Sequence, residues 1–174
     1  MLVGIMIGQR TPGVTVAQAR EFEERINQRY VDHLVPAGWG YYGVYQVEGL
    51  VSGAFGEILL SEDDDLDEAL RRDKENDADL PEDIAAFYRE CRGLFWQRGS
   101  TGKIWRQLDE PPPRGVPLRI TIGEGTFELE PVDATAPPDV DVVPEDAPRV
   151  PREVPGGTTL VFHPFVTAPL PSAG

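Results

Sequence analysis

Residues 39–60, WGYYGVYQVEGLVSGAFGEILL, are the stretch that decides the fold. They are rich in aromatic and β-branched residues, which favour strands, and their glycines stand where bends or bulges would occur. The pattern predicts two strands joined by a turn near residues 48–53. An antiparallel sheet is therefore expected to form the centre of the fold.

One amphipathic helix is expected before this hairpin and a second one after it. Thr15 can cap the first, over residues 15–34, whose apolar face is formed by Ala19, Phe22, Ile26, Tyr30 and Leu34. Pro36 and Gly38 would end it. The second is predicted over residues 81–97, where Pro81 suits a first helical position. Its apolar residues recur at helical spacing: Ile84, Phe87, Cys91, Leu94 and Phe95.

Further strands are expected at residues 2–7, a continuous apolar run, and at 116–122 and 126–132, which alternate around a glycine-rich turn. The predicted fold class is α+β. It consists of an antiparallel sheet of four or five strands with two main helices on one face, plus an extended Pro-rich C-terminal tail.

The composition changes after residue 132, and this change predicts three regions. Residues 1–132 are expected to form a compact α+β domain. Residues 133–157 are dense in Pro, Asp, Val and Glu, so we expect an extended linker. Residues 158–174 regain apolar character and are expected to form a C-terminal strand or docking segment.

The charge of the chain favours a basic protein partner. Its 30 acidic and 16 basic residues give a formal net charge of -14 at pH 7. Such an excess repels nucleic acid and anionic membranes and steers the protein towards positive surfaces. No apolar run approaches the roughly 20 residues that a membrane span needs. The single cysteine and the lack of a signal-peptide pattern indicate a cytoplasmic protein.

The sequence offers little apparatus for catalysis. It has two histidines and one cysteine, so the commonest nucleophile, acid–base and metal combinations are hard to assemble. Residues 99–103, GSTGK, resemble a phosphate loop, but Gln97 and Ile104 stand where that motif needs Gly and Ser or Thr. Residues 73–84 lack the Gly and Glu of a calcium loop. We therefore expect a binding protein rather than an enzyme, with no metal, no cofactor and no catalytic residue.

The acidic residues gather between positions 62 and 83, where twelve carboxylates face only Arg71, Arg72 and Lys74. A solvated, charged helix is the simplest interpretation of such a run. However, clustered like charges work against folding unless something positive binds there. Together with aromatic residues nearby, they predict a partner-binding surface made of Asp63, Asp64, Asp65, Asp67, Glu68, Asp73, Glu75, Asp77, Trp39 and Tyr42.

In layout, residues 15–133 resemble immunity proteins of the YezG type, which protect bacteria from their own secreted toxins. The likeness lies in the order of parts: helix 15–34, the aromatic residues 39–42, the acidic stretch 62–79, helix 81–97, Trp105 and hairpin 116–132. No diagnostic motif accompanies it, and residues 2–7 and 133–174 depart from the plan. The resemblance implies tight, stoichiometric inhibition of one toxin.

The expected function is thus a non-catalytic acidic binding protein that occludes a basic partner surface, as an immunity protein does to a nuclease-like toxin. The alternative is a structural component of a viral or other multi-subunit assembly. In that case the C-terminal arm would contact neighbours, with self-association through residues 158–174, because an apolar strand can add to an exposed sheet edge.

Overall fold

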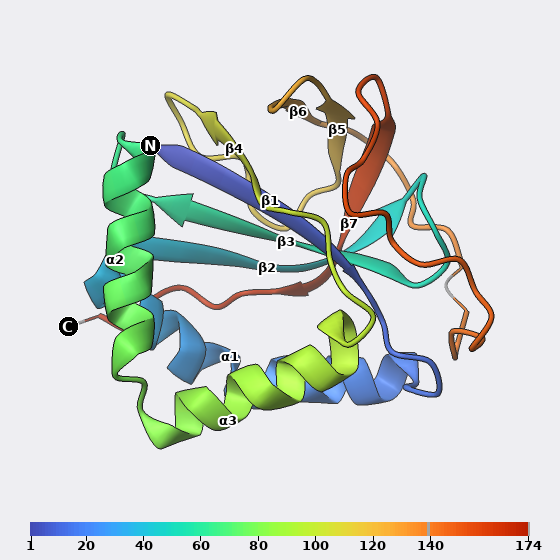
Figure 1. Cartoon of the computed structure of the whole chain (residues 1–174), viewed down its shortest axis with the longest axis horizontal. Coiled ribbons are helices and arrows are strands. Elements are labelled where there is room, and N and C mark those ends of the chain that lie inside the picture. Colours follow the sequence, from blue (N-terminus) through green and yellow to red (C-terminus); the bar gives the residue numbers. More distant parts are fainter. Residues whose placement is uncertain (139, 174) are drawn as a thin grey trace.

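The computed structural model describes residues 1–138 and 140–173, apart from the side chain of Tyr42. In these residues one antiparallel sheet contains seven strands, three helices pack against it, and Figure 1 shows their arrangement. The strands are β1 (Leu2–Gln9), β2 (Trp39–Glu48), β3 (Ala54–Ser61), β4 (Ile104–Gln107), β5 (Leu118–Ile122), β6 (Phe127–Pro131) and β7 (Thr159–Thr167). The helices are α1 (Val16–Leu34), α2 (Leu66–Ala78) and α3 (Glu82–Cys91).

The strands are ordered β4-β1-β3-β2-β7-β5-β6, and the sheet curls until its two edges approach each other. Between these edges, the Arg106 guanidinium of β4 donates a hydrogen bond to the Phe127 carbonyl oxygen of β6 at 2.7 Å. It also forms an ion pair with Glu128. The sheet is therefore a nearly closed barrel.

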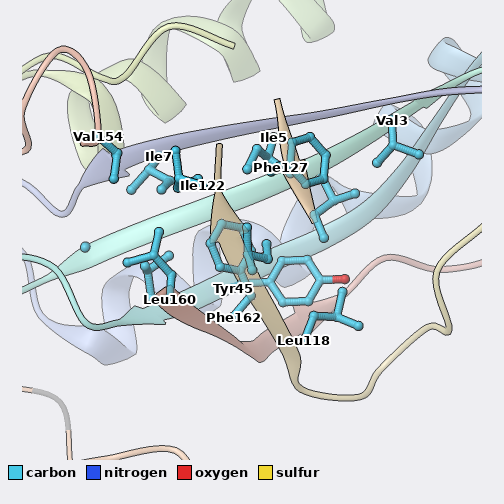
Figure 2. Packing of buried hydrophobic residues seen from close by; sticks show 14 of the residues in the cluster. Val3, Ile5, Ile7, Tyr45, Leu118, Ile122, Phe127, Val154, Leu160 and Phe162 are labelled. Carbon is cyan, nitrogen blue, oxygen red and sulfur yellow. The ribbon is translucent and has the colours of Figure 1, made fainter. Parts of the chain in front are cut away.

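One face of the curled sheet encloses an apolar core (Figure 2). Alternate residues of each strand point into it, for example Val3, Ile5 and Ile7 of β1. The largest rings in this core belong to Tyr45, Phe127 and Phe162. Because successive side chains of a strand point to opposite faces, the residues between them point to the face of the sheet that the helices cover.

The other face of the sheet is covered by helices, which explains why β1 and β3 are apolar on both faces. In Figure 1, α1 and α3 run beneath strands β1–β3, and α2 stands across one end of these strands. α1 begins with a capping box, in which Thr15 and Gln18 exchange side-chain and backbone hydrogen bonds. Gly38, in the left-handed conformation at φ 75°, follows the short 3₁₀ turn after α1 and leads the chain into β2.

Two glycines of β1 leave room for indole rings. A Cβ on Gly4 would lie 2.7 Å from the Trp105 ring, and one on Gly8 would lie 2.0 Å from the Trp96 ring. Both distances are far below van der Waals contact. Trp96 belongs to the π-helical turn (Arg92–Trp96) that continues α3, so Gly8 allows this turn to pack closely on the sheet.

The Pro-rich segment between β6 and β7 is packed against the domain. Val143, Val150 and Val154 are buried, and the last two belong to the core of the barrel. The fully buried Arg10 side chain donates hydrogen bonds to the carbonyl oxygens of Val140 and Asp141. Backbone carbonyls that an extended segment cannot pair internally are thus satisfied by a side chain of the domain.

The predicted sheet of four or five strands with two helices is therefore wrong. The chain forms seven strands and three helices among its described residues. The additional strands are β4, which pairs with β1, and β7, which lies between β2 and β5. The strand expected within residues 158–174 is thus present as β7 (Thr159–Thr167), an internal strand of the sheet.

Candidate functional site

The helix α2 carries most of the acidic run and is attached loosely to the domain. Ala69 is the one residue of α2 that is buried, whereas Leu66 and Leu70 expose 36% and 43% of their surface. The Asp65 carboxylate caps the helix by accepting a hydrogen bond from the Glu68 backbone N–H at 2.9 Å. The outer face of α2 therefore combines negative charge with exposed leucine.

Part of this charge is paired within the chain. Arg71 contacts both Glu68 and Glu75, and its guanidinium holds the pKa of the Glu68 carboxyl below the usual value. The N-terminal ammonium group of Met1 lies 2.7 Å from Asp64 and likewise lowers its pKa. These pairs are exposed, and such pairs contribute little to stability. Even so, ten carboxylates and three cations between positions 62 and 79 leave the surface strongly negative.

The structure divides the predicted partner-binding residues into two groups. An outer group lies on the acidic surface, at the start of α2 and along its outer side: Asp64, Asp65, Asp67, Glu68 and Glu75. Asp63 precedes α2, but its side chain is only 15% exposed and forms an ion pair with Arg72 at 3.5 Å. An inner group lines a cavity under α2: Asp73, Asp77 and the buried Trp39. Tyr42 belongs to β2, but its side chain lies outside the described part of the chain.

The cavity lies between the helical side of the sheet and the three helices, and its volume is about 290 Å³. Aromatic rings form much of its wall: Tyr30, Trp39, Tyr41, Phe55, Phe87, Tyr88, Phe95 and Trp96. Four carboxyl groups also line it, namely those of Glu23, Glu57, Asp73 and Asp77. Acidic groups thus share a partly open cavity with aromatic rings.

Glu23 is the most buried of these acids, with 2% of its surface exposed. It lies on the buried side of α1, between Ala19 and Asn27 one turn away in each direction. Burial and the nearby Glu57 raise its pKa to about 8, although the Tyr41 hydroxyl donates a hydrogen bond to Glu23 Oε2 at 3.2 Å. At neutral pH this carboxyl group is therefore mostly protonated.

Glu57 enters the cavity from the middle of β3, where its paired neighbours are Met6 of β1 and Val44 of β2. Burial raises the pKa of its carboxyl group, and the positive charge of Lys103 opposes this rise. No hydrogen bond or salt bridge joins this carboxyl group to another described residue. Among the described residues, this half-buried carboxyl group therefore has no hydrogen-bond donor.

Asp77 and Asp73 of α2 complete the acidic lining, four residues apart on one side of the helix. Burial raises the pKa of Asp77, with a further rise from the charge of Asp73. Lys103 and Arg92 oppose this rise and line the same cavity. The acidic lining thus contains more negative than positive groups.

The nucleophiles of the cavity are held in their neutral forms. Burial raises the pKa of the Cys91 thiol well above its ordinary value, and the Trp96 indole N–H donates to its sulfur at 3.3 Å. Burial likewise raises the pKa of the Tyr30, Tyr41 and Tyr88 hydroxyls. Because the thiolate is the reactive form of cysteine, this environment favours binding over nucleophilic chemistry.

Both histidines lie outside the cavity. His33 at the end of α1 contacts the Asn76 side chain at 3.2 Å, and burial lowers its pKa. His163 of β7 lies 2.8 Å from a carboxylate oxygen of Glu48. Neither imidazole lines the cavity beside Cys91.

Sequence reasoning missed Glu23 and Glu57, although a signal for each was present. Glu23 follows Phe22 on the apolar face of a helix, and Glu57 interrupts the apolar run of residues 54–60. A carboxylate inside a hydrophobic pattern predicts a buried acid, and buried acids with raised pKa values gather at functional sites. The dense acidic run at 62–83 drew attention away from these two isolated residues.

Within residues 1–138 and 140–173, no group of three His, Cys, Asp or Glu side chains is arranged to hold a metal ion. None of the helices described is long and apolar enough to cross a membrane. Comparison with protein-family models and with curated proteins finds no match to this chain.

Proposed function

We propose that this chain is a non-catalytic acidic binding protein that occludes a basic surface of a partner. In our proposal it is a bacterial immunity protein, acts in the cytoplasm and inhibits a nuclease-like toxin. The substrate groove of a nuclease is basic because it binds phosphates, so an acidic protein is complementary to it. The YezG-like order of parts in residues 15–133 agrees with this role.

The observation that carries the proposal is the outer face of α2. This face presents the carboxylates of the acidic run next to the exposed Leu66 and Leu70. Charge of one sign accelerates association with an oppositely charged surface, and apolar contacts supply affinity once the partners meet. Ala69 is the one buried residue of α2, so this helix can change its position at low cost when a partner binds.

The alternative role, a structural component that contacts neighbours through residues 158–174, has less support. β7 pairs with β2 over residues 161–167 and with β5 over residues 159–162. A strand inserted between two others of its own chain cannot be donated to a neighbour without opening the sheet.

The proposal is tested by neutralising four exposed carboxylates of the acidic run: Glu62→Gln, Asp67→Asn, Glu75→Gln and Asp79→Asn. The partner is first captured from the native source with the wild-type protein, then purified for association kinetics across a range of salt concentrations. We expect the variant to associate about 10-fold more slowly at low salt, with a flatter salt dependence, because steering by charge is lost.

A control variant carries the same change in net charge on exposed loops away from α2: Glu124→Gln, Glu145→Gln, Asp146→Asn and Glu153→Gln. It should associate at close to the wild-type rate. Equal rates for wild type and the α2 variant at every salt concentration would contradict the proposal, as would a captured partner with an acidic surface.

A further inference from the structure

The cavity beneath α2 is a second site, separate from the outer acidic surface. Its four carboxyl groups face two cationic side chains, Lys103 and Arg92. The two acids that lie deepest come from different elements, Glu23 from α1 and Glu57 from β3. Placing two carboxyl groups together away from bulk water costs stability, so a compensating ligand is a physical explanation for their presence.

Two polar groups in the wall lack hydrogen-bond partners among the residues that the structure describes. Trp39 is 3% exposed, and its buried indole N–H makes no hydrogen bond to another described residue. The half-buried Glu57 carboxyl group also accepts no hydrogen bond from another described residue, and it lines the cavity, so a ligand there can reach it. Buried polar groups are nearly always paired. The Trp39 N–H therefore needs a hydrogen-bond acceptor, whereas the Glu57 carboxyl group needs a donor.

We propose that this cavity binds a small organic cation, an alkylammonium or guanidinium group on a compact carbon skeleton. Glu57 and Glu23 serve as its counter-ions, and the rings of Tyr30 and Tyr41 form the surface on which it rests. Aromatic faces attract cations through the negative potential of the ring, and this attraction strengthens when the cation is removed from water.

The lining selects a cation over other ligands. An anion would approach four carboxyl groups with only Lys103 and Arg92 to offset them. A purely apolar ligand would cover the half-buried Glu57 without offering it a hydrogen-bond donor, which carries a desolvation penalty. An ammonium or guanidinium group supplies the donor that Glu57 lacks, and its carbon chain can pack against rings such as Phe87 and Phe55. The Trp39 N–H is a donor, so its partner would be an acceptor elsewhere on the ligand, such as a hydroxyl oxygen on the carbon skeleton.

The size of the cavity limits the ligand. At about 290 Å³ it lies at the lower end of the range for small-molecule sites. With roughly 30 Å³ for each water-sized group, it holds about ten non-hydrogen atoms. A compact amine fits this space, whereas a nucleotide or a folded peptide does not.

Cation binding should release a proton. Glu23 is mostly protonated in the empty protein at neutral pH, because its pKa is about 8. A bound cation favours the ionised carboxylate, so Glu23 loses its proton and affinity increases as the pH rises towards 8. The titratable and charged groups that share the cavity with Glu23 are Tyr30, Tyr41, Glu57, Asp73, Asp77, Tyr88, Cys91, Arg92 and Lys103.

The proposal is tested by calorimetric titration of the full chain with n-butylammonium, tetramethylammonium and guanidinium chlorides, and with sodium butyrate as the anionic counterpart. We expect at least one cation to bind with a dissociation constant of about 1 mM or tighter, and butyrate not to bind. Repeating the titration in buffers of different ionisation enthalpy should show proton release near pH 7 that diminishes above pH 8.

Glu57→Gln should weaken binding of that cation at least tenfold, because the amide keeps the shape of the side chain and removes its charge. Glu62→Gln, on the exposed surface before α2, is the matched control and should bind as wild type does. Should Glu57→Gln fail to fold by circular dichroism, Glu23→Gln and the proton release of the wild-type protein test the same claim. The proposal is overturned if none of the three cations binds at about 10 mM. It is also overturned if Glu57→Gln binds the cation as tightly as Glu62→Gln does.

This test is independent of the proposed inhibitor function. The cation titration needs no partner protein, and the α2 variant with four neutralised outer carboxylates should retain cation binding. Conversely, Glu57→Gln leaves the outer face of α2 unchanged, so it should not alter partner association.

Discussion

At the scale of single residues, Glu23 makes the fold less stable than it could be. Its pKa is about 8 in the folded protein and 4.5 in the unfolded chain. Below pH 4.5 both states are protonated, so the group has no effect there. Between these values the unfolded chain loses the proton and the folded protein keeps it, so stability falls by about 1.4 kcal/mol per pH unit. Above about pH 8 the loss is complete.

Glu23→Gln should therefore stabilise the protein in alkaline solution. At about pH 9 we expect the free energy of unfolding to rise by about 2–4 kcal/mol, less than the full linkage value because the amide must also be buried. At about pH 4 the variant and wild type should differ little, since both side chains are neutral. Urea unfolding at the two pH values measures this. The exposed neighbour Glu24→Gln is the control, and a variant less stable than wild type at pH 9 would mean that the native site stabilises ionised Glu23.

At the scale of elements, the boundaries of a helix were predicted well where its capping residue and its apolar periodicity matched the face that the sheet buries. α1 forms over Val16–Leu34 because the cap at Thr15 and the apolar periodicity specify the same boundaries. At the start of α2 a local signal competes with strand pairing: Ser61 is a residue type that caps helices, but it stays in β3, paired with Leu2 and Trp39. Asp65 caps the helix instead. Pairing between distant strands decided between two adequate caps, and a local pattern does not contain that information.

The structure also makes α2 the least anchored of the three helices. With one buried side chain, it gains little hydrophobic stabilisation, whereas α1 buries seven residues. We expect its backbone amides to exchange with deuterium faster than those of α1, because local opening costs less free energy where few apolar contacts are lost. Hydrogen exchange followed by mass spectrometry measures this for both helices in one sample. Equal protection of α1 and α2 would mean that α2 opens only when the whole domain unfolds.

At the scale of the whole molecule, the sequence predicted hairpins but not the closure of the sheet. The hairpin of β5 and β6 joins neighbours in sequence, and alternation around residues 123–125 predicted it. β7 pairs with β2, more than a hundred residues earlier, so no local pattern identified its partner. The Pro-rich segment before β7 reads as a linker by composition, yet it buries Val150 and Val154 in the core of the barrel. The cavity was hidden for the same reason, since its two deepest acids come from separate elements.

The position of β7 implies that the C-terminal segment is required for folding. Phe162 is fully buried, and its ring lies where a Cβ on Gly56 would come within 2.5 Å, so this part of the core is tightly packed. Phe162→Ala should lower the free energy of unfolding by about 3–5 kcal/mol, the usual cost of the lost contacts and the remaining cavity. Thr159→Ala, on the exposed start of the same strand, should cost less than about 1 kcal/mol. Urea unfolding of the two variants distinguishes an internal strand from a detachable arm, because an arm that docks only on a neighbour would leave the stability of the isolated chain unchanged by either substitution.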